Sequence, residues 1–539
     1  MNNTNIQIPE LSLVLLVGAS GCGKSSFARK HFKPTEVISS DYCRGLVSDD
    51  ENNQACSKAA FEVLRFIAAK RLAAGKLTVI DATNVQTESR KELINLAREY
   101  HVIPVAIVLN LPKEICFARN ADRPDRQFGK HVIWNQSNQL QRSLKYFRRE
   151  GISQTTILAT TEEVECVTIE RTRLWNNLNH EKGPFDIIGD VHGCYDELVQ
   201  LLGKLGYTIA PGEPTRVVHP DGRKLIFVGD LVDRGPAVPQ TLRLVMDVVD
   251  GGTGFCVIGN HDDKLKRKLQ GRDVKIAHGL AESLTQLAVE DEEFSKRVVH
   301  FIDALRSHYV FDGNKLAVAH AGIKAEYIGR GSPRIRDFCM FGESTGEIDE
   351  FGLPVRYPWA RDYRGETLVI YGHTPVPEPE WINNTIDIDT GCVFGGKLTA
   401  LRYPERAIVS VPAARVYCEP IKPLAPAKDD RGGNDVLDIN DVIGKRIVTT
   451  KLHHNVTVRE ENAIAALEVM SRFAIDPHWL VYLPPTMSPT ETSKRPELLE
   501  HPDEAFSFYQ SKGVTRLICE EKHMGSRAIV VVCRDNAAA

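Results

Sequence analysis

Strand-like apolar segments alternate with helix-like stretches along the first part of the chain. The strand-like segments are LSLVLLV (residues 11–17), VISSD (37–41), KLTVIDATN (76–84) and VIPVAIVLNL (102–111), while residues 56–74 repeat their apolar positions with a helical period. Short strands separated by amphipathic helices are typical of a parallel sheet with crossover helices. We therefore predict an α/β domain over residues 1–170.

A second series of apolar segments begins after a polar stretch, residues 171–184, that ends in Gly-Pro. FDIIGDVHG (185–193) is followed by LIFVGD, CVIGNH, LAVAH and LVIYGH, so most of these strands run directly into Asp or His. This pattern predicts a second α/β domain over 180–418. The Pro-, Gly- and charge-rich stretch 419–435 is typical of a linker, and 436–539 begin a third unit.

Composition narrows the class of protein. A chain of 539 residues is too long for one core, which agrees with several domains. The net charge of −4 excludes a global basic field, so a nucleic-acid partner would need local patches. The twelve cysteines form no CxxC pair, which predicts reduced thiols in a cytoplasmic protein. We see no basic leader and no apolar run of membrane-spanning length, and so expect no membrane partner.

The run GASGCGKS, residues 18–25, follows the first strand and precedes a helix-compatible stretch. Glycines at this turn let backbone N–H groups point at phosphates, a lysine reaches the β/γ-phosphates, and a hydroxyl ligates Mg²⁺. We therefore predict an ATP and Mg²⁺ site. Its residues are Gly18, Gly21, Gly23, Lys24, Ser25 and Ser26.

Two further signals accompany this loop. Asp41 at the predicted tip of the second strand is suited to act as a general base, although a helix N-cap is an alternative. Asp81 at the next strand end is suited to support Mg²⁺ or simply to begin a turn. The segment RNADRPDR places Arg119, Arg123 and Arg126 together, as in a lid that stabilises a transferring phosphoryl group.

The phosphate loop, the SSDxxR motif of residues 39–44 and the arginine-rich segment resemble the polynucleotide 5′-kinase family. The resemblance implies that Lys24 and Ser25 bind the phosphates and the metal, and that Asp41 activates a 5′-OH. It also implies that Arg44 holds the 3′-flanking phosphate of the acceptor and that Arg123 is the lid arginine.

The central region carries five motifs in the order GDVHG, GDLVDRG, GNHD, HAG and GHTP, each after an apolar strand. Their polar side chains are expected to meet at the carboxyl edge of a sheet. Carboxylates, imidazoles and an amide together favour Mn²⁺, Fe or Ni²⁺ over thiolate-bound Zn²⁺, whereas any one of them alone would be a turn or core residue. The residues are Asp190, His192, Asp230, Asp233, Arg234, Asn260, His261, His320 and His373.

This order closely resembles the binuclear metallophosphoesterases. The resemblance implies a first metal on Asp190, His192 and Asp230, and a second on Asp230, Asn260, His320 and His373. It further implies that His261 protonates the leaving oxygen, Asp233 orients His261 and Arg234 grips the phosphate. We expect Asp389 near the same site, unless it only begins a turn.

EKHMGSR, residues 521–527, matches the KxxGxR nucleophile pattern and resembles the covalent nucleotidyltransferases. The resemblance implies that Lys522 carries AMP and that Arg527 contacts ribose or phosphate. About twelve residues follow Arg527, so we expect this ligase domain to be incomplete and adenylation of Lys522 to be weak or absent.

The succession of kinase, phosphatase and ligase motifs resembles the bacterial polynucleotide kinase-phosphatase family. The resemblance implies RNA repair: phosphorylation of 5′-OH ends, removal of 2′,3′-cyclic, 2′- or 3′-phosphates with two Mn²⁺ or Ni²⁺ ions, a 3′-terminal ribose 2′-O-methyltransferase as partner, and possible homo-oligomers. Two enzymatic alternatives stay open for the centre, a serine/threonine-type protein phosphatase and a diadenosine polyphosphate hydrolase, each fused to a small-molecule kinase. A nucleotide-sensing scaffold is the non-enzymatic alternative, and the intact site residues argue against it.

Overall fold

The computed structural model separates the chain into two units, Met1–Lys428 and Asp429–Ala539, which are described one at a time. None of the described helices is long and apolar enough to cross a membrane. The eleven cysteines within the described part of the chain are all free thiols. The described residues are 5–122, 128–210, 212, 214–349, 353–421, 439, 442–444, 446–450, 454–472 and 491–521.

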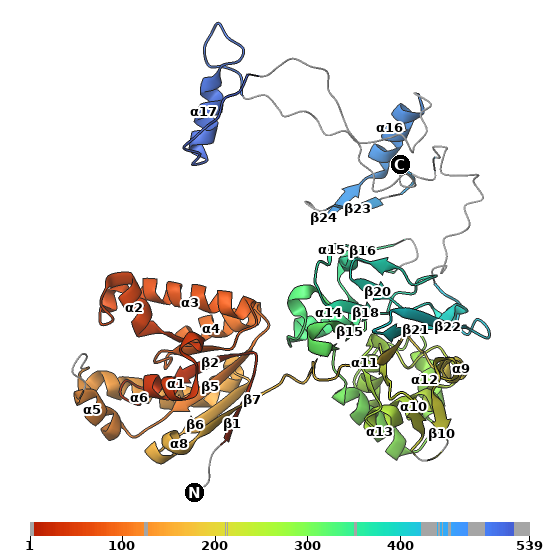
Figure 1. Cartoon of the computed structure of the whole chain (residues 1–539), viewed down its shortest axis with the longest axis horizontal. Coiled ribbons are helices and arrows are strands. Elements are labelled where there is room, and N and C mark those ends of the chain that lie inside the picture. Colours follow the sequence, from red (N-terminus) through yellow and green to blue (C-terminus); the bar gives the residue numbers. More distant parts are fainter. Residues whose placement is uncertain are drawn as a thin grey trace. The chain divides into compact units, whose positions relative to one another are not determined.

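The N-terminal part of the first unit is built on a parallel five-stranded sheet of order β3-β4-β2-β5-β6, drawn in red to yellow in Figure 1. Strand β2 (Ser12–Val17) is buried along its whole length at the centre. This confirms the predicted parallel α/β class and adds a fifth strand. The other strands are β3 (Val37–Ser39), β4 (Thr78–Asp81), β5 (Ile103–Leu109) and β6 (Gln154–Leu158).

Helices cover both faces of this sheet because both faces of β2 are apolar. Val14 and Leu16 pack with α1 (Lys24–His31), whereas Leu13 and Leu15 belong to the core cluster on the other face. A strand buried on both faces needs a continuous apolar run, as residues 11–17 supply. The remaining helices are α2 (Ser40–Ser48), α3 (Ser57–Ala73), α4 (Thr87–Glu99), α5 (Lys113–Ala121), α6 (Lys130–Ser143), α7 (Phe147–Glu150) and α8 (Thr161–Cys166).

A buried ion pair joins α4 to α7. Arg90, fully buried, donates from Nε and from a terminal nitrogen to the two oxygens of Glu150 at 2.8 Å each, and its guanidinium lies 4.3 Å from the Phe147 ring centre. Removing one partner leaves an unpaired buried charge. The loss of either Arg90 or Glu150 alone is therefore expected to destabilise the packing of α7 against α4.

We expect Glu150→Ala to lower the free energy of unfolding by about 3–5 kcal/mol, because it strands the Arg90 charge in the core. Urea unfolding read by amide hydrogen exchange in α4 measures this. Glu92→Ala breaks the exposed Arg65–Glu92 pair and serves as the control, with an expected loss of at most about 1 kcal/mol. Equal losses for the two variants would contradict the interpretation.

The segment predicted as a seam contributes strands on both sides. β7 (Thr168–Thr172) pairs in parallel with β1 (Asn5–Pro9), and β8 (Asn177–Leu178) pairs with β14 (His308–Phe311). The domain boundaries at 170 and 180 stay a prediction.

Residues 177–412 fold as two sheets packed face to face, drawn in yellow-green to teal in Figure 1. One sheet has the order β13-β12-β9-β21-β22 and the other β19-β20-β18-β15-β14-β8. Their strands are β9 (Phe185–Ile188), β12 (Lys224–Phe227), β13 (Gly254–Cys256), β15 (Leu316–Ala319), β18 (Leu368–Tyr371), β19 (Trp381–Ile382), β20 (Thr385–Asp387), β21 (Lys397–Tyr403) and β22 (Ala407–Pro412).

Alternation along the strands builds this sandwich. Ile187 of β9 and Val318 of β15 meet in the cluster between the sheets, whereas the neighbouring Ile188 belongs to the cluster formed with the helices. This confirms the predicted α/β sandwich. The covering helices are α9 (Tyr195–Leu205), α10 (Val238–Asp250), α11 (Asn260–Leu269), α12 (Leu280–Leu287), α13 (Glu292–Ala304), α14 (Pro333–Phe341) and α15 (Trp359–Asp362), and the short strands are β10 (Thr208–Ala210), β11 (Arg216–Val218), β16 (Ser344–Ile348) and β17 (Pro354–Arg356).

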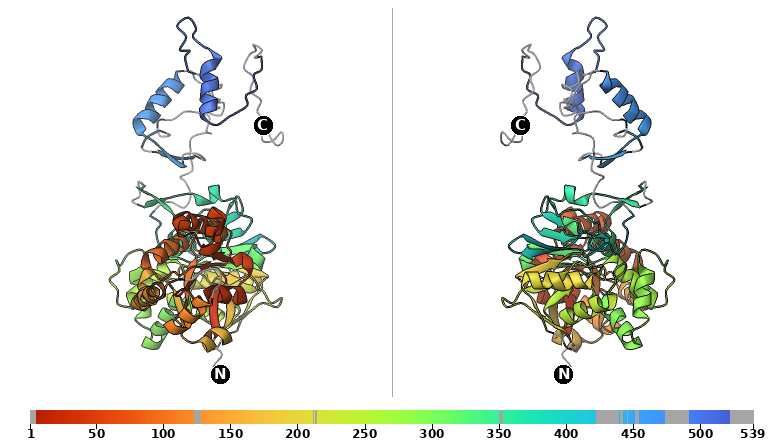
Figure 2. Two further views of the ribbon diagram at one scale, coloured as in Figure 1. Left: turned by 90° about the vertical axis from the view of Figure 1, so that its left-hand side faces the viewer. Right: turned by 90° about the vertical axis from the view of Figure 1, so that its right-hand side faces the viewer.

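The described part of the second unit, in blue in Figure 2, consists of a hairpin and two helices. β23 (Arg446–Thr450) pairs antiparallel with β24 (His454–Val458), followed by α16 (Glu460–Ser471) and α17 (Pro502–Ser511).

Candidate active sites

The glycine-rich loop connects β2 to α1, as the sequence predicts, and α1 begins at Lys24. Lys24 is buried, and its Nζ donates to the carbonyl oxygens of Gly18 at 2.9 Å and Ala19 at 3.0 Å. The ammonium is thus held against the loop, where a phosphate would sit. A loop of this form at a helix N-terminus is an anion site.

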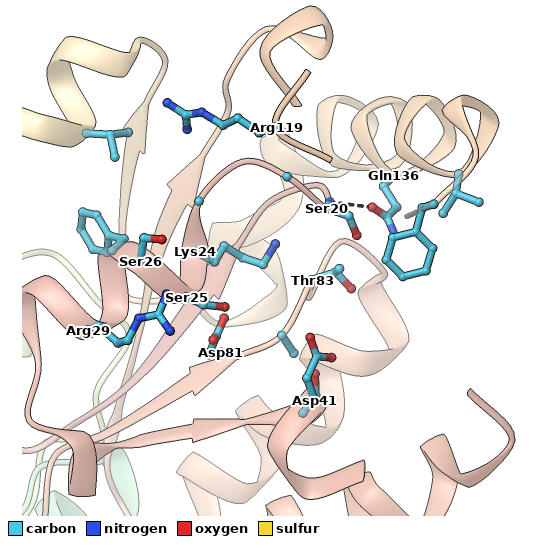
Figure 3. A pocket seen from close by; sticks show the side chains of 18 of the residues that line it. Ser20, Lys24, Ser25, Ser26, Arg29, Asp41, Asp81, Thr83, Arg119 and Gln136 are labelled. Carbon is cyan, nitrogen blue, oxygen red and sulfur yellow. Dashed lines mark hydrogen bonds between the residues drawn. The ribbon is translucent and has the colours of Figure 1, made fainter. Parts of the chain in front are cut away.

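A cavity of about 680 Å³ opens next to this loop, and Figure 3 shows the side chains that line it. Ser25, Ser26 and Asp81 lie on its inner wall, and Asp41 and Arg44 come from α2. The cavity walls therefore carry cationic side chains that could bind a polyphosphate and a carboxylate that could accept a proton. The cavity therefore brings together most of the predicted kinase residues.

Asp41 is not at a strand tip, which corrects the sequence prediction. β3 ends at Ser39, so Asp41 lies in the first turn of α2. Ser39 caps the helix by accepting from the backbone N–H groups of Asp41 and Tyr42, so the alternative of Asp41 as N-cap is also wrong. The Asp41 carboxylate instead pairs with Arg44 and lines the cavity.

The cavity is also lined by one residue of the predicted arginine-rich lid segment and by one residue that the sequence analysis did not identify. Arg119 of α5 lines it, whereas the resemblance implied Arg123 as the lid arginine. Gln136 of α6 accepts from the backbone N–H of Ser20 at 2.8 Å and so ties α6 to the phosphate loop. Arg123 and Arg126 lie outside the described residues.

The central motifs converge at one edge of the two sheets. His192, Asp230 and His261 present ligand atoms within 4.8 Å of one another, and so do Asp230, His320 and His373. Asp230 belongs to both groups, as expected of a carboxylate that bridges two ions. Each of these residues follows a strand, so the strand ends bring together residues that are far apart in sequence. Asp190 and His373, for example, are 183 residues apart, and Asp190 Oδ2 accepts from the His373 N–H at 3.1 Å.

Backbone carbonyls orient two of the imidazoles. His192 Nδ1 lies 2.7 Å from the Val232 oxygen, and His320 Nδ1 lies 3.0 Å from the Val228 oxygen. Each Nδ1 therefore carries the proton, which leaves Nε2 free to bind a metal. His320 Nε2 faces Asn260 Oδ1 at 3.0 Å and Asp230 Oδ2 at 3.4 Å.

The donor set fits two divalent cations. Asp190 Oδ1 is buried and has no hydrogen-bond partner among the described residues, which an ion would supply. Burial, followed by the carboxylates of Asp389 and Asp230, raises the pKa of Asp190 well above its usual range. Burial lowers the pKa of His192 and His373 well below theirs, so both imidazoles are neutral ligands. Nearby cations would stabilise the ionised carboxylates.

The backbone conformation at this edge of the sheets leaves space for the carboxylates of Asp190 and Asp230. His192, Asp230 and His373 all have positive φ, an uncommon conformation that marks strain at functional sites. Gly259 and Gly372 lie so close that an added Cβ would sit 2.1 Å from Asp230 Oδ1 and 2.2 Å from Asp190 Oδ1. A larger residue at either position would displace the neighbouring carboxylate.

His261 is held for proton transfer. Its Nδ1 lies 2.6 Å from Asp233 Oδ2, and the other Asp233 oxygen accepts from the Ser283 hydroxyl at 2.6 Å. Ser283, on α12, was not anticipated from sequence because no motif marks it. The Arg234 guanidinium lies 2.7 Å from His192 Nε2 and 3.1 Å from His261 Nε2 and covers the Phe394 ring.

Asp389 is buried at the same edge, as expected from the sequence. Burial raises its pKa to about 6, although the Gly391 N–H donates to its Oδ1 at 3.0 Å and lowers the pKa. Its charge acts on Asp190. Lys522 and Arg527 lie outside the described residues.

Comparison with known proteins finds three matching family models. An AAA domain matches residues 13–149, a calcineurin-like phosphoesterase matches 183–400, and a PNKP adenylyltransferase domain, ligase domain matches 465–539. These matches confirm the predicted fold class of all three parts. The first implies nucleotide binding and the second divalent metals.

Curated relatives match the central part. Bis(5′-nucleosyl)-tetraphosphatase PrpE of Anoxybacillus flavithermus is 47% identical over 237 residues, 43% of this chain and 96% of that protein. The Bacillus subtilis protein of the same name is 45% identical over 239 residues, 44% of this chain and 97% of that protein. The solved structure of a candidate diadenosine tetraphosphatase is 26% identical, covering 44% of this chain and 96% of its own, with a TM-score of 0.33.

Proposed function

Because residues 183–400 make this chain a member of the calcineurin-like phosphoesterase family, and a P-loop domain and a PNKP-type ligase module share the chain, we propose that it is an RNA end-healing enzyme. It phosphorylates 5′-OH ends with ATP and removes 2′,3′-cyclic, 2′- or 3′-phosphates from the opposite end. One observation carries the proposal: the three modules supply the three chemistries needed to repair and join a broken strand.

In the kinase cavity, the Asp41 carboxylate accepts the proton of the 5′-OH as that oxygen attacks the γ-phosphorus of ATP. The bond from the γ-phosphorus to the β,γ-bridging oxygen breaks, and ADP leaves. Lys24 and Arg119 stabilise the negative charge on the phosphoryl oxygens. Ser25 and Asp81 are placed to hold Mg²⁺, which would neutralise phosphate charge when bound.

In the phosphoesterase, we propose that Asp190, His192 and Asp230 would hold one Mn²⁺ or Ni²⁺ ion and that Asp230, Asn260, His320 and His373 would hold a second. Such ions supply Lewis acidity and a nucleophilic water near neutral pH. Arg234 binds the phosphate oxygens, and His261, oriented by Asp233, gives a proton to the leaving ribose oxygen.

The ligase module adds a third proposed step, supported by the family match over 465–539. The amine of Lys522 would attack the α-phosphorus of ATP, form a phosphoramide with AMP and release pyrophosphate, and we expect this reaction to be weak or absent with this chain alone. Arg527 is proposed to contact the ribose or a phosphate.

A second candidate function is asymmetric hydrolysis of dinucleoside tetraphosphates by the central domain. It is favoured by the activity for which the relatives that are 45–47% identical to this part of the chain are named. Metal-assisted attack on a phosphoanhydride needs the same ligand set, so the metal centre alone does not separate the two substrates.

We expect one RNA strand with a 5′-OH and a 2′,3′-cyclic phosphate to gain a 5′-phosphate and lose the cyclic phosphate when incubated with ATP and Mg²⁺ or Mn²⁺. Electrophoresis with labelled ATP and mass spectrometry follow the two ends. Diadenosine tetraphosphate is run in parallel under the same conditions. An RNA changed only at its 5′ end, together with rapid tetraphosphate cleavage, would replace the phosphatase part of the proposal with the second candidate.

A further inference from the structure

Cations gather along α11 and the loop that follows it, beside the phosphoesterase centre. Residues 264–278 contain one acid, Asp273, and six basic residues: Lys264, Lys266, Arg267, Lys268, Arg272 and Lys275. α11 begins with the predicted metal ligand Asn260 and the proton donor His261. Lys264 lies three to four positions later and so shares their face of the helix.

The loop after α11 is fixed against the phosphate-binding arginine. Lys264 Nζ donates to the Ala277 oxygen at 2.6 Å, which holds the loop close to the helix. Two residues on, Gly279 packs against the backbone of Arg234, because an added Cβ would sit 2.4 Å from the Arg234 backbone nitrogen. His278, between these anchors, is therefore held at the rim of the metal centre.

Like charges are concentrated here. Burial, followed by Lys264, Arg234 and His261, lowers the pKa of His278. Burial also lowers the pKa of Lys264, and the charges of Arg234 and Lys275 lower it further, whereas Asp233 raises it. The Asp233 carboxylate is already bonded to His261 and Ser283. Among the described residues, Lys264 and Lys275 form no salt bridge, unlike Lys266, which pairs with Asp263 and Asp303.

We propose that Lys264, Lys275 and His278 form a second phosphate subsite, which binds the phosphodiester next to the terminal nucleotide of a polyribonucleotide. This inference rests on the proposed function and identifies a part of the RNA, beyond the phosphate that is removed, that the phosphoesterase binds. Lys264 and Lys275 supply charge, and the His278 imidazole donates a hydrogen bond in its neutral form. Lys275 and His278 are exposed and accessible to a strand that leaves the metal centre.

The test compares a 3′-phosphorylated decaribonucleotide with para-nitrophenyl phosphate, which has no flanking phosphate. We expect Lys275→Ala/His278→Ala to raise KM for the RNA about tenfold with kcat nearly unchanged, and to leave both constants for para-nitrophenyl phosphate unchanged. The dependence of RNA binding on salt is expected to fall by about one unit of slope. Lys296→Ala, which removes an exposed lysine of α13 paired with Glu292, is the matched control and is expected to change neither substrate.

Equal losses on both substrates would overturn the subsite, because they would mean that the loop only positions Arg234. An unchanged KM for RNA would overturn it as well. Diadenosine tetraphosphate forms a third arm: a KM raised for this substrate and not for RNA would assign the cations to a polyphosphate and reject the proposal. Failure of the proposed function gives a different result, since the wild-type enzyme would then cleave para-nitrophenyl phosphate and leave the RNA intact.

Discussion

Replacing Asp230 with asparagine will lower the phosphoesterase rate by at least about a thousandfold, while 5′-phosphorylation proceeds at its normal rate. Asp230 lies in both groups of ligand atoms, so its charge is shared by both proposed metal positions. Several kcal/mol of transition-state stabilisation depend on the metals, and each 1.36 kcal/mol corresponds to a factor of ten. Steady-state hydrolysis together with the metal content of the purified protein measures the effect.

Asp221→Asn makes the same chemical change at an exposed position, where the carboxylate is 81% accessible, and is expected to alter neither activity nor metal content. If the D230N protein kept two ions and full hydrolysis, Asp230 would not be a ligand of the metal centre. Loss of both kinase and phosphoesterase activity would instead mean that the two sites do not work independently.

Replacing Lys24 with alanine will lower the rate of 5′-phosphorylation by about a thousandfold or more and leave phosphoester hydrolysis intact. The Lys24 ammonium donates to the carbonyl oxygens of Gly18 and Ala19 in the glycine-rich loop. A positive charge held ready at the transferring phosphoryl group acts mainly on the transition state, so the loss should appear in kcat. Single-turnover transfer from labelled ATP to a 5′-OH oligonucleotide measures it.

Lys91→Ala, on the exposed side of α4, is the matched control for Lys24→Ala and should behave as wild type. If Lys24→Ala kept normal transfer, the glycine-rich loop would not be the triphosphate site. If it removed hydrolysis as well, the model of separate domains would be wrong.

Apolar runs and strand-end motifs predicted both α/β domains and the residues that gather at each site. Such prediction works because parallel strands end at one edge, so a motif after each strand identifies its neighbours. The sequence analysis assigned Asp41 to a strand end, whereas β3 ends at Ser39 and α2 begins at the next residue. The pattern VISSD does not reveal where the strand ends and the helix begins. Boundaries of this kind depend on capping by Ser39, which is visible only in the structure.

Residues that act across helices escaped prediction for a different reason. Ser283 reaches Asp233 from 50 positions away, and Gln136 reaches the Ser20 amide from 116 positions away. Neither residue lies in a motif, and each reaches its partner only because of the way its helix packs on the sheet. The same is true of Lys264, whose role depends on the loop that its amine holds.

The tight approach of Gly372 to Asp190 and of Gly259 to Asp230 makes the metal centre depend on two residues that carry no ligand atom. A larger side chain at either glycine would take the space of the carboxylate, even with all ligand residues present. Transfer of the ligand residues alone to another scaffold would therefore not reproduce the centre, because the backbone path that leaves room for the carboxylates has to be transferred with them.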